Sequence, residues 1–249
     1  MTTATHQTQL AQEKHHAAAA AVGWVRDGMN LGLGTGSTAA IFITLLGEAV
    51  RAGQLRVVGT ATSIASETLA RQVGIPLQAP RRGLRFDLTI DGADELDGQL
   101  RLIKGGGGAL LREKVLATAS DYLLIIGDSS KMVPQLGRFP LPLEVVPFAL
   151  PWVLDAVEKL GGAPVVRHNS ADVSQCVRSD QGNLLIDCHF ETIADPAKLA
   201  SQLQNIPGIV EQGLFLGLAK AALVANGEQV QVLRPGVAPT PAGDFTELP

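Results

Sequence analysis

The stretch NLGLGTGSTAAIFITLLGEAV, residues 30–50, joins a short apolar segment to a longer one through a glycine-rich turn. This order predicts a β-strand, a tight turn and a helix from about Ser37 to Val50. The same order recurs along the chain, with strands expected at 55–62, 84–90 and 121–131 and helices at 64–74 and 109–120. Strands that alternate with helices are typical of an α/β fold. We therefore predict a Rossmann-like, mostly parallel sheet with helices on both faces.

The pattern of elements changes near residue 137, where prolines begin to interrupt the sequence. A helix, a hairpin around the turn DQGN (180–183) and a second helix starting at Pro196 are expected in this part. This succession predicts a smaller α+β domain, ferredoxin-like, inserted into the larger one. The predicted boundaries are 1–137 and 212–235 for the Rossmann-like domain, 138–211 for the small domain and 236–249 for a disordered, proline- and glycine-rich tail.

The composition restricts the class of protein. The chain has 249 residues, of which 46% are hydrophobic, and this proportion supports a sizeable core and argues against global disorder. The formal net charge of −4 disfavours a nucleic-acid partner, because such proteins are more often basic. An anionic small ligand is compatible with this charge, since local lysines and backbone N–H groups decide its binding.

The ends and the cysteines indicate where the protein resides. The N-terminal segment lacks the basic and apolar regions of a secretory signal, and the apolar run AAAAAVGWV (17–25) is too short to span a bilayer. Cys176 and Cys188 lack the spacing of a metal or redox motif and are expected to be apolar residues in a reducing cytosol. We therefore predict a cytoplasmic protein with no membrane partner.

Polar or glycine-rich segments follow the predicted strands, namely GTGST (34–38), GTATS (59–63), DGADE (91–95) and GDSSK (127–131). In an open α/β sheet, ligands bind beyond the carboxyl ends of the strands, so these segments are expected to meet at one site. The first is not a dinucleotide motif, because Ser37 stands at the third glycine position and no acid ends the second strand. A helix N-terminus with the hydroxyls of Thr35, Ser37 and Thr38 suits a phosphate or a polyol anion.

The segment from DGADE to KGGGGALLREK (104–114) carries the groups that suit acid–base chemistry. Asp91 and Asp94 are carboxylates crowded into one turn after a buried strand, an arrangement that suits acid–base work. Four glycines after Lys104 predict a backbone that passes very close to a ligand. Glu113 follows in the next helix. The alternatives for these acids are a helix cap, solvated carboxylates or a surface ion pair; as a set they favour proton transfer next to a carbonyl on a small phosphorylated substrate.

These motifs, together with FPLPLEVVP (139–147), GNLLIDCHF (182–190) and IPGIVEQGLF (206–215), resemble the A-type ribose 5-phosphate isomerase family over roughly residues 14 to 220. The resemblance implies interconversion of D-ribose 5-phosphate and D-ribulose 5-phosphate through an enediolate, in the non-oxidative pentose phosphate pathway. It implies no metal or organic cofactor. It also implies a homodimer or a homotetramer.

The resemblance assigns roles by position. Glu113 would be the base between C2 and C1, Asp91 would assist ring opening, and Lys104 would stabilise the enediolate oxygen. Asp94 would orient the substrate hydroxyls. The residues expected to line the substrate site are Thr35, Gly36, Ser37, Thr38, Asp91, Gly92, Ala93, Asp94, Lys104, Gly105, Gly106, Gly107, Lys131 and Lys14. Arg178 or Lys198 of the small domain could add to the phosphate site.

Two kinds of alternative use the same motifs. One is another enzyme on this scaffold, an amino-sugar phosphate deaminase or a coenzyme A transferase; histidines at 6, 15, 16, 168 and 189 avoid the strand-end motifs, which argues against a deaminase. The other is a sugar-phosphate-sensing module without catalysis, which would need the anion cradle but not Glu113. Such a sensor normally carries a DNA-binding segment, and residues 1–27 are too short for one.

Overall fold

The computed structural model describes residues 3–170 and 172–244. Within them a seven-stranded sheet has the order β14-β13-β12-β6-β3-β1-β2. Its strands are β1 (Asn30–Leu33), β2 (Val58–Ala61), β3 (Leu88–Gly92), β6 (Leu123–Asp128), β12 (Ala219–Asn226), β13 (Gln229–Arg234) and β14 (Val237–Pro241). The pairs from β2 to β12 are parallel, and β13 and β14 add an antiparallel edge. β1 has β2 on one side and β3 on the other, so the chain reverses direction there and opens a crevice at the carboxyl ends of β1 and β3.

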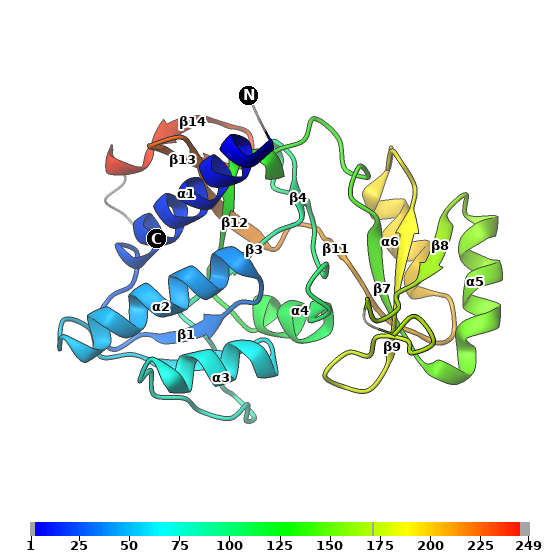
Figure 1. Ribbon diagram of the computed structural model, residues 1–249, viewed down its shortest axis with the longest axis horizontal. Coiled ribbons are helices and arrows are strands. Elements are labelled where there is room, and N and C mark those ends of the chain that lie inside the picture. The colour runs from blue at the N-terminus through cyan, green and yellow to red at the C-terminus, as the bar shows by residue number, and fades with distance from the viewer. Residues whose placement is uncertain (1–2, 171, 245–249) are drawn as a thin grey trace.

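Helices and short strands cover both faces of this sheet, as predicted (Figure 1). On one face, α1 (Thr3–Val22), α2 (Ser37–Arg51) and α3 (Ile64–Gln72) contribute to one core around Leu31, Leu33 and Phe42. The opposite face carries α4 (Leu110–Thr118) and a three-stranded sheet of β4 (Glu95–Leu96), β5 (Leu102–Ile103) and β11 (Leu214–Phe215). Among the described residues, no helix is both long and apolar enough to cross a membrane.

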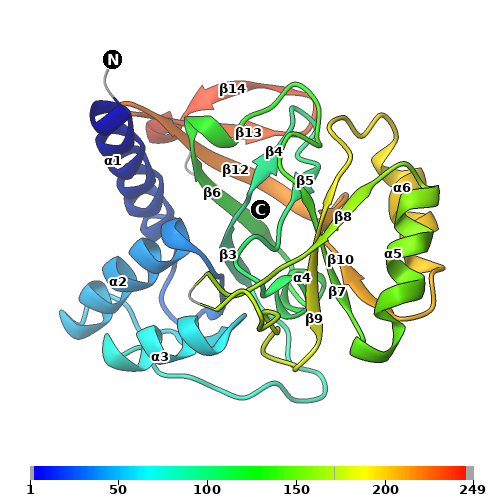
Figure 2. The ribbon, with the colours of Figure 1, turned by 45° about the vertical axis from the view of Figure 1, so that its right-hand side comes forward.

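A four-stranded antiparallel sheet of the described chain has the order β10-β7-β9-β8. The four strands and the helices between them follow along the chain as β7 (Leu141–Val145), η2 (Pro147–Ala149), α5 (Leu150–Lys159), β8 (Ala163–Val166), β9 (Leu184–His189), α6 (Pro196–Gln204) and β10 (Ile209–Gln212). The succession of strands and helices is that of a ferredoxin-like unit. Figure 2 shows α5 and α6 on the outer side of this sheet, so that its other side turns toward α4.

The C-terminal segment differs from the prediction. Residues 237–241 form β14, which pairs with β13, and η3 (Ala242–Asp244) follows. The expectation of a disordered tail is therefore wrong for residues 237–244, and residues 245–249 lie outside the described residues. The prolines misled the prediction, because an edge strand tolerates residues that lack an N–H on its unpaired side.

Candidate active site

A small polar cavity lies beyond the carboxyl ends of β1, β3 and β6, at the point where the strand order reverses. Three segments that are far apart in the sequence meet there: the N-terminus of α2, the turn after β3 and the glycine-rich loop before α4. The lining residues are Thr35, Gly36, Ser37, Thr38, Gly92, Ala93, Asp94, Lys104, Gly105, Gly107, Glu113 and Lys131. The structure thus brings together most of the predicted site residues, whose roles it does not test.

A buried lysine stands between two buried carboxylates at the floor of this cavity. Lys104 is 2% exposed; its Nζ lies 3.0 Å from Asp91 Oδ2 and 3.2 Å from Glu113 Oε1. The ammonium also donates to the Gly92 carbonyl over 2.5 Å. One cation therefore faces two carboxylates in a place from which water is largely excluded, and this imbalance favours protonation of one of them.

The surroundings of Glu113 favour its protonated form. Burial is the largest cause, and the neighbouring Asp91 charge adds to it; together they outweigh Lys104 and raise the pKa of Glu113 to about 8. For Lys104, burial acts in the opposite direction, but Asp91 and Glu113 prevail and raise its pKa, so it stays charged. Glu113 Oε2 is buried and has no hydrogen-bond partner among the described residues. Of the two carboxyl groups beside Lys104, Glu113 is the one that lines the cavity.

Asp91 lies below the cavity and not in its wall. It is fully buried, and its Oδ1 accepts hydrogen bonds from the N–H groups of Thr35 (3.0 Å) and Gly92 (2.8 Å). A Cβ at Gly34 would come within 2.2 Å of that oxygen, so only glycine lets β1 approach it. Burial raises the pKa of Asp91 against the opposing effect of Lys104. In this position Asp91 connects the exits of β1 and β3 and holds Lys104.

The anion cradle at α2 is built from backbone more than from Thr35. Gly36 precedes the helix with φ of 109°, and no side chain caps the first turn, so its N–H groups are open to a ligand. The Thr35 hydroxyl turns away and bonds Thr62 Oγ1 (2.7 Å) and Ser63 Oγ (2.8 Å). The sequence pattern placed the Thr35 hydroxyl in the anion cradle and did not predict this network. It did indicate that the segment 59–63, which contains Thr62 and Ser63, is the exit of a strand.

The predicted lysines lie in different places. Lys131, on η1 (Ser129–Lys131), lines the cavity. Lys14 is not among the lining residues; its Nζ lies 4.0 Å from Oδ2 of Asp128, whose side chain caps η1. Lys14 therefore lies beside the residue that caps η1, and its contact with substrate remains a prediction. Arg178 and Lys198 do not line the cavity either.

The glycine-rich loop follows Lys104 and contacts Asp94. The Gly106 N–H donates to Asp94 Oδ2 over 2.7 Å, and Gly105 and Gly108 have φ of 106° and 80°, in the left-handed region that favours glycine. A Cβ at Gly106 would lie 2.6 Å from Asp94 Oδ1. Close approach of the loop to this carboxylate therefore requires glycine at 106.

Gly106→Ala is expected to lower kcat/KM by about 100-fold, because the added methyl group displaces Asp94 from the place where it can meet the substrate. Steady-state kinetics on the sugar phosphate that the family resemblance implies measure the effect. Gly98→Ala is the matched control, since a Cβ there meets nothing within 4 Å, and it should change kcat/KM less than twofold. Equal kinetics for the two variants would show that the placement of Asp94 is unimportant.

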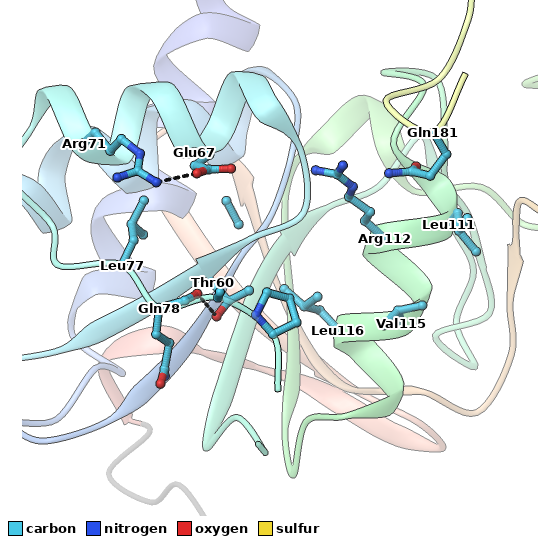
Figure 3. Close-up of a pocket in the computed structure, with 13 residues that line it drawn as sticks. Thr60, Glu67, Arg71, Leu77, Gln78, Leu111, Arg112, Val115, Leu116 and Gln181 are labelled. Carbon is cyan, nitrogen blue, oxygen red and sulfur yellow. Dashed lines mark hydrogen bonds and ion pairs between the residues drawn. The ribbon is translucent and has the colours of Figure 1, made fainter. Parts of the chain in front are cut away.

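A larger cavity of about 510 Å³ lies between α3 and α4 (Figure 3). Apolar side chains such as Leu77, Leu111 and Val115 contribute much of its wall. Its charged groups are already engaged, Arg71 with Glu67 at 2.5 Å and Arg112 with Asp180, in the turn before β9, at 3.7 Å. The buried carboxylates that suit proton transfer belong to the smaller cavity, which is therefore the candidate active site.

The fold and the site together define a class of protein. The protein has a doubly wound α/β sheet and an anion cradle at a helix N-terminus. Beside an ammonium group it holds a buried carboxyl group with a pKa of about 8. These features are typical of an enzyme that moves protons on a small anionic substrate.

Comparison with known proteins narrows this class. The family model of ribose 5-phosphate isomerase A (phosphoriboisomerase A) matches residues 58–229. Ribose-5-phosphate isomerase A of Bradyrhizobium diazoefficiens is 49% identical over 230 residues, which cover 89% of this chain and 95% of that protein. The structure of ribose 5-phosphate isomerase A from Methanocaldococcus jannaschii is 40% identical, with a TM-score of 0.85 and coverage of 90% and 98% of the two chains. A D-ribose-5-phosphate isomerase solved in complex with phospho-erythronic acid is 35% identical, with a TM-score of 0.87 and coverage of 90% and 99%.

The chain belongs to the ribose 5-phosphate isomerase A family. It is an enzyme, an aldose–ketose isomerase.

Proposed function

We propose that Glu113 carries the proton in the interconversion of D-ribose 5-phosphate and D-ribulose 5-phosphate. The observation that supports this role is the Glu113 Oε2 atom, which is buried at the cavity and lacks a hydrogen-bond partner among the described residues. A base must reach the substrate with a free oxygen, and a raised pKa strengthens its affinity for the proton. Glu113 meets both conditions.

The chemistry can be followed atom by atom. The C2–H bond of the open-chain aldose breaks, its proton moves to Glu113, and its electron pair forms the C1–C2 double bond while negative charge develops on O1. The hydroxyl proton then passes from O2 to O1, the C2 carbonyl forms, and Glu113 returns the proton to C1. The negative charge thus moves from the glutamate to the substrate oxygen and back, so the electrostatic balance of the buried cluster is preserved.

Lys104 is suited to stabilise that oxygen. In this structure its ammonium group contacts Asp91, Glu113 and the Gly92 carbonyl. When Glu113 takes the proton it loses its charge, and its hold on the ammonium weakens. Lys104 can then donate to the enediolate oxygen in a site with little water, where such an interaction is strong.

The remaining groups bind and orient the substrate. The N-terminus of α2, with Ser37 and Thr38, and Lys131 suit the phosphate, and Asp94 suits the sugar hydroxyls. The related isomerase solved with phospho-erythronic acid supports a small phosphorylated ligand. The ring-opening role of Asp91 remains a prediction; the contacts of its carboxylate support a role in holding Lys104 and the Thr35 backbone.

The pH dependence of the isomerisation tests the proposed base. Glu113 must be ionised to accept a proton, and its pKa of about 8 means that the neutral carboxyl dominates below that pH. We expect kcat/KM to increase with pH and to level off above about 8, because this parameter reports ionisations of the free enzyme. Kinetics across the range from acid to mild alkali measure it. A plateau that already begins in the acid range would contradict a raised pKa for the base.

A cytoplasmic location remains a prediction from the N-terminal segment and the cysteines, and a homodimeric or homotetrameric state remains a prediction from the family resemblance. Light scattering on the purified chain measures the second directly.

A further inference from the structure

Arg167 connects the small sheet to the glycine-rich loop of the active site. It directly follows β8, and its Nη1 donates to the Gly106 carbonyl over 3.0 Å and lies 3.5 Å from the Gly105 carbonyl. Its other side binds Asp187 of β9, with Nε at 2.9 Å from Oδ2 and Nη2 at 2.5 Å from Oδ1. The planar guanidinium group therefore spans from a carboxylate on one sheet to two carbonyl groups of the loop.

The arginine is held in place independently of the loop. Its backbone N–H donates to the Leu185 carbonyl over 2.9 Å, and its carbonyl accepts from the Val177 N–H over 2.8 Å. Two hydrogen bonds to Asp187 then fix the side chain, which is 18% exposed. The guanidinium is thus a rigid donor whose direction is set by the small sheet.

A trans peptide is planar, so its C=O and N–H groups point in opposite directions. The described residues contain no cis peptide bond. The Gly106 carbonyl points to Arg167, and the N–H of Gly107 in the same peptide therefore points away from it. Gly107 lines the active-site cavity, and its N–H has no acceptor within residues 3–170 and 172–244. This N–H is available to a substrate oxygen.

The loop needs such an anchor because glycine peptides rotate easily. The peptide before it is held from both ends, since Gly105 O accepts from Gly108 N over 2.9 Å and Gly106 N donates to Asp94. In the Gly106–Gly107 peptide, the carbonyl group accepts a hydrogen bond from Arg167, which is its donor among the described residues. Without Arg167 this peptide could rotate and turn the Gly107 N–H away from the cavity.

We propose that Arg167 is a positioning residue, which orients the Gly107 N–H toward the substrate through its hydrogen bond to the Gly106 carbonyl. The proposal rests on the isomerase function and on the cavity described above. The proposal gives the small sheet an indirect part in the reaction. The sheet contacts no substrate atom itself, but it fixes the direction of a backbone N–H donor in the larger domain.

The test is Arg167→Ala, with Arg85→Ala as the matched control. Arg85 also binds a carboxylate, that of Asp121, but it precedes the amino end of β3 and lies away from the loop. We expect kcat for ketose formation to fall on the order of 10- to 100-fold in Arg167→Ala, with KM changed less than threefold, because a preorganised donor acts mainly in the transition state. Arg85→Ala should match the wild type. Arg167→Lys should recover only part of kcat, since an ammonium cannot bind Asp187 and the carbonyl in the same plane.

Two further readouts separate positioning from folding. Guanidinium chloride at tens of millimolar should raise kcat of Arg167→Ala several-fold and leave Glu113→Gln unchanged. The pH midpoint of kcat/KM should stay at the wild-type value, because Arg167 does not contact Glu113. Unchanged kcat in folded Arg167→Ala would overturn the proposal. So would a loss of kcat that follows a loss of folded protein and that guanidinium does not restore. Inactive wild type would instead overturn the isomerase function.

Discussion

Glu113→Gln is expected to lower kcat for ketose formation from ribose 5-phosphate by about 10²- to 10⁴-fold, the range that a positioned general base contributes. Glutamine nearly matches glutamate in shape and keeps an oxygen for the 3.2 Å contact with Lys104, but it cannot accept a proton. Substrate binding should therefore change little. The measurement is turnover by wild type and variant side by side in the presence of a chelator, with binding of phospho-erythronic acid followed by calorimetry.

Glu67→Gln is the matched control, because Glu67 also lies in the first turn of a helix but its side chain is 43% exposed and pairs with Arg71. It should retain wild-type kcat. Equal turnover by wild type and Glu113→Gln would exclude Glu113 as the base. Binding without turnover by the wild type would favour the sensing module over the isomerase.

Glu113→Gln should also be more stable than the wild type at alkaline pH. Unfolding would then not explain its loss of activity. Glu113 has a pKa of about 8 in the folded chain and 4.5 ordinarily, so the folded state holds the proton more tightly. The stability that this proton provides is complete below 4.5 and is lost as the pH increases through 8. Glutamine never ionises. The Tm of Glu113→Gln relative to that of the wild type should therefore increase across that pH range. A Tm difference that does not change with pH would contradict burial of the charge.

Lys104→Met is expected to lower kcat/KM by about 10²- to 10³-fold and to destabilise the fold by about 3–5 kcal/mol at neutral pH. Removing the ammonium leaves Asp91 and Glu113 as neighbouring buried carboxylates without their shared cation. Both would then hold protons more tightly than in the unfolded chain, so stability should return as the pH falls and the two groups become neutral. Denaturant unfolding at several pH values measures this, with kinetics on the same samples.

The double variant Lys104→Met/Glu113→Gln separates charge balance from catalysis. It removes one of the two repelling carboxylates and should regain part of the stability without regaining activity. Lys159→Met, at the exposed end of α5, should resemble the wild type in both measurements. Near-normal turnover by Lys104→Met would refute a role for the ammonium in stabilising the enediolate. A pH-independent loss of stability would refute the buried charge cluster.

Much of the site was accessible from the order of residues alone. Parallel strands end at one edge of a sheet, so the segments after β1, β3 and β6 had to meet once the alternation of strands and helices was recognised. This rule brought Ser37, Asp94 and Lys131 to one place. The glycines marked a close backbone approach, which the contact of Gly106 with Asp94 now explains. Local chemistry along the chain therefore determined the fold class and the membership of the site.

The tertiary structure decided what those residues can do. The pKa of Glu113 depends on burial and on its distances to Asp91 and Lys104, which belong to separate segments of the chain. The same is true of Arg167, since no pattern near it predicts that β8 will bring it to a loop sixty residues earlier. Strand ends follow from local pattern, whereas burial and hydrogen-bond direction arise only when distant segments pack together. The sequence by itself thus determined which groups meet, and packing alone decided how strongly burial and neighbouring charges raise the pKa of Glu113.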